Sequence, residues 1–216
     1  MTEVKGLLVM DVDSTLIYEE VIDLLGEAAG VGEKVADITE RAMRGELDFE
    51  KALRARVALL KGLKASIFEE VLRNIHVTKG AQELITKLHS EGYKIGVVSG
   101  GFHETVDSLA SRLGIDYVKA NRLEIKDGLL TGQVLGEIVT KETKKNMLLK
   151  WAKEHHLAAE DTVAVGDGAN DLPMIQTAGI GIAFNAKPVV REAAPYQINE
   201  YDLYQVWDVI QSSKRK

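Results

Sequence analysis

Residues 7–17 read LLVMDVDSTLI, and this stretch decides the fold of the chain. Its apolar half, residues 7–10, is long enough for one buried strand, and it stops abruptly at Asp11 and Asp13. Where a strand ends and the chain bends, that spacing lets one carboxylate point forward while the other turns aside. Because ligands of open parallel sheets bind at the carboxyl ends of strands, we expect a site here. The alternative for these polar residues is a turn with a helix cap.

Two other kinds of binding site are excluded because required positions hold the wrong residues. In an EF-hand calcium loop counted from Asp11, the required glycine would be Leu16 and the bidentate glutamate would be Ile22. In a dinucleotide-binding fingerprint begun at Gly166, position 171 would be Gly or Ala, but it is Asp171. Neither a calcium loop nor a dinucleotide loop is therefore expected.

The composition indicates a globular protein with a full core. The chain has 216 residues, of which 45% are hydrophobic and 28% charged, which suits one domain or one domain with an insertion. A net charge of −6 disfavours nucleic acid and anionic membranes as partners. An anionic substrate must therefore be attracted by local cations or by a metal. We expect a monomer or homodimer that acts on a small molecule.

The absence of cysteine and the two ends of the chain bear on the compartment. With no cysteine there are no disulfides, no thiol catalysis and no cysteine-built zinc site, which favours a reducing compartment. Residues 1–5 are polar and the apolar run after them is too short for a signal peptide or membrane span. We therefore expect a cytoplasmic protein. The last residues, SSKRK at 212–216, are expected to be a frayed basic tail.

A block of helices follows the first strand. Apolar residues recur at helical spacing, and Ser66 with Glu69 suggests a capping box before the last helix. No strand is expected between residues 16 and 77, and so long a block is too large for an ordinary crossover. We expect a helical cap domain at 16–76, inserted into a core domain of 1–15 and 77–216. The expected helices span 18–29, 35–45, 48–60 with Asp48 as N-cap, and one from about 66.

Strands and helices alternate after residue 77. This rhythm predicts an α/β fold with a Rossmann-like parallel-sheet core, and Asp127-Gly128 predicts a β-hairpin between 123–125 and 129–134. The other expected strands are 93–98, 117–120, 162–165 and 180–184, and the expected helices are 80–90, 103–113, 141–155 and 203–210.

Three of the apolar strands end in polar or glycine-rich motifs. Besides residues 11–15, these are Ser99-Gly100-Gly101 and Gly166-Asp-Gly-Ala-Asn-Asp171. A parallel sheet brings such ends to one edge, where glycines and helix N-termini favour a phosphate group. A carboxylate about 4 Å from a phosphate charge repels it by roughly 4 kcal/mol at an effective dielectric near 20. A hard divalent cation is therefore needed, and Asp11, Asp167 and a backbone carbonyl suit Mg²⁺.

These three motifs, with a lysine near the start of the 141–155 helix, resemble the haloacid dehalogenase superfamily of aspartate-dependent phosphatases. Residues 16–76 further resemble its phosphoserine phosphatases with a small cap, through Met43, Phe49 and the run at 54–62. The similarity covers nearly the whole chain. Val12 stands where many relatives have Phe, and we expect little consequence for the chemistry because this residue should face the core.

The resemblance implies roles for the strand-end residues. Asp11 would attack phosphorus and form an aspartyl-phosphate, and Asp13 would protonate the leaving alcohol and later activate water. Asp11, the Asp13 backbone carbonyl and Asp167 would bind Mg²⁺, with Asp171 as support outside the ligand shell. The groups holding and neutralising the phosphate would be Ser99, the Gly100 N–H and Lys144.

The resemblance also implies a reaction, the release of L-serine from O-phospho-L-serine, the last step of serine biosynthesis. A bidentate arginine suits the carboxylate of such a substrate and a glutamate its ammonium group. The implied residues are Arg56 and Glu20, with Met43 and Phe49 as apolar cover and Asn170 near the substrate. The residues alone do not distinguish Arg56 from Arg54, Glu20 from Glu19, or Lys144 from its solvated neighbours.

Two other functions remain open at this stage. A relative of the same shape could hydrolyse another small phosphate ester, such as phosphohomoserine, or transfer its phosphoryl group to an acceptor such as homoserine. A phospho-accepting signalling module also uses strand-end aspartates and a lysine on a parallel sheet. A helical cap and a second aspartate placed as acid and base argue against the signalling module.

Overall fold

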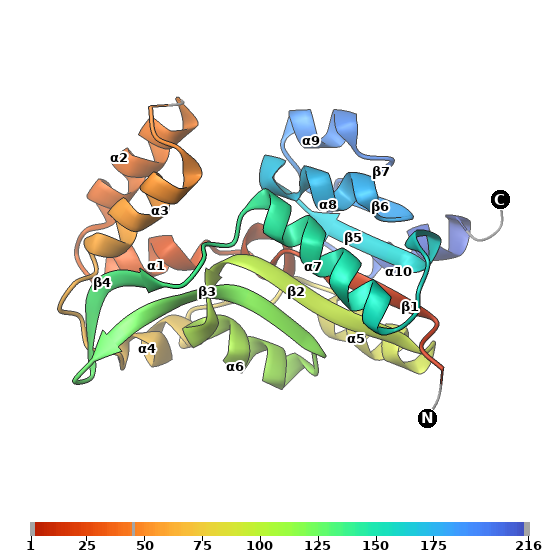
Figure 1. The fold of residues 1–216 in the computed structure, drawn as a ribbon, viewed down its shortest axis with the longest axis horizontal. Coiled ribbons are helices and arrows are strands. Elements are labelled where there is room, and N and C mark those ends of the chain that lie inside the picture. Colours follow the sequence, from red (N-terminus) through yellow and green to blue (C-terminus); the bar gives the residue numbers. More distant parts are fainter. Residues whose placement is uncertain (1–2, 45, 214–216) are drawn as a thin grey trace.

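The core of the molecule is one seven-stranded sheet in the order β4-β3-β2-β1-β5-β6-β7 (Figure 1). The structure is a computed structural model that describes residues 3–44 and 46–213. Neighbouring strands pair in parallel except β3 and β4, which form an antiparallel hairpin. The predicted parallel α/β core is confirmed. The strands are β1 Gly6–Met10, β2 Tyr93–Phe102, β3 Tyr117–Lys126, β4 Leu129–Leu135, β5 Thr162–Gly166, β6 Ile180–Phe184 and β7 Tyr196–Ile198.

Helices cover both faces of the sheet (Figure 1). Side chains of β1 alternate between two clusters of buried apolar residues: Leu8 and Met10 belong to one, Leu7 and Val9 to the other. One face packs against α5 Ala81–Ser90, α6 His103–Leu113 and α10 Gln205–Ser213. The other packs against α7 Lys141–Glu154, α8 Leu172–Thr177 and α9 Pro188–Ala193.

Four further helices lie between β1 and α5 in the chain and gather beside the β3–β4 hairpin (Figure 1). Asp48 caps α3 as predicted, since its carboxylate accepts a 2.8 Å hydrogen bond from Lys51 N. No strand lies among the described residues of this block, although an isolated bridge joins Ile17 to Val77 where it begins and ends. The helices are α1 Val21–Ala28, α2 Gly32–Met43, α3 Phe49–Ala58 and α4 Ile67–Arg73.

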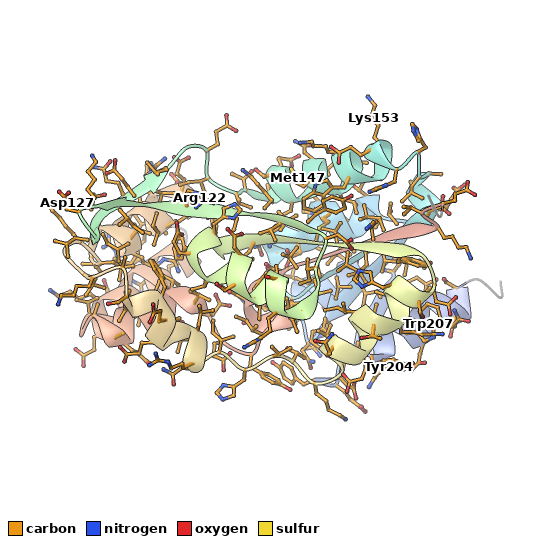
Figure 2. All side chains as sticks on the ribbon, turned by 90° about the horizontal axis from the view of Figure 1, so that it is seen from below. Arg122, Asp127, Met147, Lys153, Tyr204 and Trp207 are labelled. Atoms are coloured by element: carbon orange, nitrogen blue, oxygen red, sulfur yellow. The ribbon has the colours of Figure 1, made fainter. Side chains whose placement is uncertain are left out.

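The predicted hairpin forms, and it is longer than expected. Asp127 and Gly128 both have positive φ, 52° and 74°, as a two-residue turn of this type requires. Figure 2 shows Asp127 at the tip, at the opposite end of the molecule from Trp207 of α10. Beyond β4, Gly62 N donates to Leu130 O and Leu130 N to Leu63 O. The segment before α4 therefore pairs with the edge strand.

Three expectations about single elements are wrong. The strand expected to stop at residue 98 continues to Phe102, because Ser99, Gly100 and Gly101 stay extended through a shift of register against β3. The strands expected at 117–120 and 123–125 are one strand, β3, which pairs with β2 and then with β4. The expected capping box does not form.

Ser66 is already helical and its side chain accepts no capping bond. Backbone carbonyls of residues 64–66 receive the first N–H groups of α4 instead, so a side-chain cap has no free donor to serve. Three short elements, β7, α8 and α9, were not expected, since three to six residues give too little periodicity to detect.

Two expectations concern residues at the limits of the described chain. Ser212 and Ser213 belong to α10, and the rest of the expected basic tail lies outside the described residues, as does Gly45 after α2. Within 3–44 and 46–213, none of the helices combines the length and the apolar character needed to cross a lipid bilayer.

Candidate active site

The sheet brings the three polar strand ends together, as predicted. β1 is the central strand and pairs with β2 on one side and β5 on the other, so their carboxyl ends share one edge. A cavity of about 300 Å³ opens there. Eight of the residues expected in the site line it: Asp11, Asp13, Glu20, Phe49, Arg56, Gly100, Asp167 and Asn170.

Asp11 and Asp171 hold the ammonium group of Lys144 between them. Lys144 Nζ lies 2.7 Å from Asp11 Oδ2 and 2.7 Å from Asp171 Oδ1, and all three residues are buried. This burial distinguishes Lys144 from the other lysines on α7, which lie exposed or half-buried: Lys141, Lys145, Lys150 and Lys153.

Charges in this cluster shift the titration of its members. Burial, and next the charge of Asp171, raises the pKa of Asp11 to about 8, although Lys144 acts in the opposite direction. Burial alone would lower the pKa of Lys144, but Asp11 and Asp171 raise it above its ordinary value. The lysine is therefore a permanent cation beside Asp11.

The surroundings of Asp13 favour the protonated form of its carboxyl group. Its Oδ2 accepts a 3.4 Å hydrogen bond from Val21 N, whereas its buried Oδ1 has no hydrogen-bond partner among the described residues. Burial, followed by the charges of Glu20 and Asp11, raises the pKa of Asp13 well above its ordinary value. A carboxyl group whose pKa is raised holds its proton more firmly than an ordinary aspartate, as a general acid must.

Asp167 completes an acidic cluster that could hold a metal ion. One carboxylate oxygen from each of Asp11, Asp167 and Asp171 lies within 4.8 Å of the others. Thr15 Oγ1 orients Asp167 by donating to its Oδ1 at 3.2 Å, and burial and the charge of Asp171 raise its pKa to about 6. Carboxylate oxygens are the donors that hard divalent cations prefer, so the residues present fit such an ion. Asp171 already bonds Lys144 and Gly168 N.

The end of β2 provides a cradle of backbone and hydroxyl groups. Ser99 is fully buried, and its Oγ accepts a 2.8 Å hydrogen bond from Gly101 N. A Cβ atom built on Gly100 would lie 3.5 Å from the ring of Phe49, so α3 closes over this cradle. Side chains larger than glycine at 100 would fill the space between the two elements.

The structure distinguishes Arg56 from Arg54. Arg56 lines the cavity, and among the described residues its guanidinium donates to two neutral oxygens, those of Ala52 and Thr39, at 3.3 and 3.4 Å. Arg54 instead bonds Glu50 at 2.8 Å on the surface. Arg56 thus borders the cavity without an ion pair to any described residue, whereas Arg54 is paired with Glu50.

The structure also distinguishes Glu20 from Glu19. Glu20 lines the cavity and accepts a 2.7 Å hydrogen bond from Ser14 Oγ. The carboxylate of Glu19 instead bonds His76. It accepts from the backbone N of His76 at 2.9 Å and lies 2.6 Å from the ring Nδ1. Of the two glutamates, Glu20 is thus the one that borders the same cavity as Arg56.

Comparison with known proteins identifies the family. The family model described as haloacid dehalogenase-like hydrolase matches residues 8–176. The chain belongs to the haloacid dehalogenase-like hydrolases. A protein of Streptococcus thermophilus named phosphoserine phosphatase is 69% identical over 97% of this chain and 98% of its own. A phosphoserine phosphatase of Methanocaldococcus jannaschii is 47% identical over 95% of this chain and 98% of its own.

Solved structures agree with this assignment to the haloacid dehalogenase-like hydrolases. A phospho-aspartyl intermediate analogue of a phosphoserine phosphatase superposes with a TM-score of 0.88 at 47% identity, covering 95% of this chain and 99% of that one. A substrate-bound phosphoserine phosphatase complex gives a TM-score of 0.89 at 46% identity, covering 96% and 99%.

Sequence reasoning missed several residues that line the site of this haloacid dehalogenase-like hydrolase. Lys187 follows β6, and the rule that strand ends carry sites could have found it. Ile22 and Leu53 also line the cavity, and the apolar pattern of their helices does not mark either of them as a site residue. Phe102 is a further unexpected lining residue, whereas Gly101, Gly168 and Ala169 belong to the predicted strand-end motifs. The side chain of Met43, expected as apolar cover, lies outside the described part of the structure.

Proposed function

We propose that this chain is a phosphoserine phosphatase that releases L-serine and phosphate from O-phospho-L-serine through an aspartyl-phosphate on Asp11. The observation that carries the proposal is a single cavity bordered by Asp11, Asp13 and Asp167 on the sheet and by Arg56 and Glu20 on the helical block. The first group suits phosphoryl transfer, and the second suits an amino acid. The 69% identical relative of that name supports the same activity.

In the proposed reaction Asp11 is the nucleophile, and Asp13 is first the general acid and then the general base. A carboxylate oxygen of Asp11 bonds to phosphorus as the bond to the serine oxygen breaks, and Asp13 gives its proton to that oxygen. Water then attacks the aspartyl-phosphate and loses a proton to Asp13, which releases phosphate and regenerates both residues. The raised pKa of Asp13 supports its role as the acid of the first step.

We propose Mg²⁺ as the cofactor, held by the carboxylates of Asp11 and Asp167 and by the Asp13 backbone carbonyl, with Asp171 supporting from outside. The bound ion would neutralise charge on the phosphate oxygens. The need for it follows from the cavity, because each carboxylate about 4 Å from a phosphate charge opposes binding by roughly 4 kcal/mol at an effective dielectric near 20. Lys144, Ser99 and the Gly100 N–H would hold the remaining phosphate charge.

Residues 16–76 would act as a cap over the core formed by 1–15 and 77–216. Arg56 would bind the substrate carboxylate and Glu20 its ammonium group, while Phe49 and Met43 shield the site and Asn170 lies beside the substrate. Closure of such a cap excludes bulk water from the aspartyl-phosphate.

Replacement of Arg56 tests the substrate assignment. We expect Arg56→Gln to raise KM for phosphoserine about 10- to 100-fold, because a charge-assisted pair with the carboxylate is worth roughly 1.5–3 kcal/mol. Arg54→Gln is the matched control and should change KM less than about twofold, since Arg54 pairs with Glu50. Steady-state kinetics with both variants decide this, and equal effects of the two substitutions would contradict the assignment.

Metal binding should depend on pH in a defined direction. The raised pKa values of Asp11, about 8, and Asp167, about 6, mean that the metal-free folded chain holds protons that the unfolded chain releases near pH 4. Its free energy of unfolding therefore falls as pH rises from about 4 to 8. Mg²⁺ must displace these protons, so its binding strengthens over the same range.

We expect the gain in Tm on adding Mg²⁺ to grow between pH 5.5 and 8. A tenfold gain in affinity corresponds to about 1.4 kcal/mol, which is about 3–6 °C for a chain of this length. Differential scanning fluorimetry with and without Mg²⁺ measures it, with Asp167→Asn as the variant that should lose most of the gain. A gain that is the same at both pH values would contradict the proposed ligands.

A substrate panel tests the activity itself. Phosphate release from phosphoserine, phosphothreonine, phosphohomoserine and sugar phosphates should be fastest with phosphoserine and should require Mg²⁺. A preference for phosphohomoserine, or transfer to homoserine, would indicate the related enzyme considered above. A single turnover followed by slow dephosphorylation would indicate a signalling module instead.

A further inference from the structure

A buried asparagine connects the two elements expected to hold the phosphate. Asn121, on β3, is 1% exposed. Its side-chain amide donates to Gly100 O at 2.8 Å, and its carbonyl accepts from Val139 N at 2.8 Å. The two backbone partners fix the orientation of the amide, because only its nitrogen can serve a carbonyl and only its oxygen can serve an N–H.

One of these bonds controls the peptide between Gly100 and Gly101. In a trans peptide the carbonyl and the N–H point in opposite directions. With Gly100 O held by Asn121, the Gly101 N–H is turned toward Ser99 Oγ, which it reaches at 2.8 Å. Ser99 Oγ thus accepts a hydrogen bond from its own loop, and its proton remains free to be donated to a ligand.

Glycine on both sides makes this peptide easy to turn. Without Asn121 the Gly100 carbonyl would lose its partner in a part-buried position, which costs about as much as a lost hydrogen bond. A flip would direct that carbonyl at Ser99 Oγ, since glycines accept the φ values a flip requires. The serine would then donate its proton to the loop and no longer to the phosphate.

The other bond of Asn121 reaches the start of α7. Val139 N precedes Thr140, whose hydroxyl caps the helix by accepting from Thr143 N at 3.2 Å. Lys144 lies one turn further on, between Asp11 and Asp171. Asn121 therefore ties the Ser99–Gly101 loop to the end of the helix that carries the buried lysine.

We propose that Asn121 is a positioning residue of the phosphate site, which sets the Gly100–Gly101 peptide so that the Ser99 hydroxyl donates to the transferred phosphoryl group. Asn121 does not touch the substrate and acts through Ser99. This inference rests on the proposed phosphatase activity, and the assay of the wild-type enzyme tests that activity separately.

A double-mutant cycle with Ser99→Ala tests the proposal. Asn121→Leu keeps the volume of the side chain and removes both hydrogen bonds, and we expect kcat/KM for phosphoserine to fall 10- to 100-fold. In the Ser99→Ala background the same substitution should lower kcat/KM less than about threefold, because the hydroxyl it orients is already gone. Inhibition by inorganic phosphate should weaken in parallel and show the same coupling.

Asn121→Ser is the second variant, for the case in which Asn121→Leu does not fold. It leaves room for a water molecule between Gly100 O and Val139 N, so a smaller loss, about three- to tenfold, with the same dependence on Ser99 is expected.

Thr162→Val is the matched control. Thr162 is also buried and also bridges two backbone groups, Ala159 O and Gly179 N, but it lies at the amino end of β5. The Thr162→Val substitution should lower Tm and leave kcat/KM within about twofold of the wild-type value. The positioning role would be overturned if Asn121→Leu lowered kcat/KM by the same factor with and without Ser99→Ala. It would also be overturned if the Asn121 variants lowered Tm and left kcat/KM unchanged. A wild-type enzyme without turnover of phosphoserine would overturn the proposed function and this inference with it.

Discussion

Asp11→Asn is expected to lower turnover of phosphoserine by about 10⁴-fold or more while leaving the fold intact. The amide has nearly the shape of the carboxylate, but it is a far weaker nucleophile toward phosphorus. Steady-state phosphate release measures the loss, and circular dichroism with a melting curve measures the fold.

Stability should move in the opposite direction to activity. Burial, and next the charge of Asp171, raises the pKa of Asp11, so the folded protein disfavours the carboxylate there. A neutral amide removes this repulsion, so the metal-free variant should melt at the same temperature as the wild type or higher. Asp37→Asn, on the exposed face of α2, is the control and should change neither quantity. Near-normal turnover in Asp11→Asn would refute the covalent mechanism.

Lys144→Met is expected to have the largest effect on stability. Lys144 is 1% exposed and its ammonium group balances Asp11 and Asp171, which would face each other unpaired without it. Removing one partner from a buried ionic cluster costs about 3–5 kcal/mol. Turnover should fall about 10²–10³-fold as well, because the cation beside the phosphate is lost.

A second substitution separates the two effects. In Lys144→Met with Asp171→Asn, one of the opposed carboxylates is neutralised, so urea unfolding should show part of the stability restored. Turnover should stay low. Lys150→Met, on the exposed side of the same helix, should leave both close to wild type. A Lys144→Met variant as stable as wild type would show that the cluster does not contribute to folding.

The sequence predicted the fold well wherever hydrophobic period and flanking residues agreed. β6 and α6 have the predicted bounds, and the hairpin turn lies at Asp127-Gly128. The errors arise where tertiary pairing decides. The extension of β2 through Ser99–Gly101 depends on β3 beside it, and the start of α4 at Ser66 depends on backbone carbonyls that no local pattern reveals.

The candidate site was predicted in part from residue types and in part only by resemblance. Strand-end carboxylates at 11, 13 and 167 follow from pattern and sheet topology. The choice of Arg56 over Arg54 does not, because both lie on one helix and only the fold turns one into the cavity.

No local pattern marks Asn121, because its importance lies in a partner distant in sequence, the backbone carbonyl of Gly100.

Labelling of the enzyme with phosphoserine tests the central claim most directly. The protein would be mixed with ³²P-phosphoserine and Mg²⁺ and quenched in acid within milliseconds, and one half would be counted for protein-bound ³²P. The other half would be reduced with borohydride, which converts an aspartyl-phosphate to homoserine as phosphate leaves, and then digested for mass spectrometry. We expect ³²P on the unreduced protein and homoserine at position 11 of the reduced protein, with neither of them in Asp11→Asn or without Mg²⁺. Label on another residue, or steady phosphate release with no labelled protein at any time, would contradict an aspartyl-phosphate at Asp11.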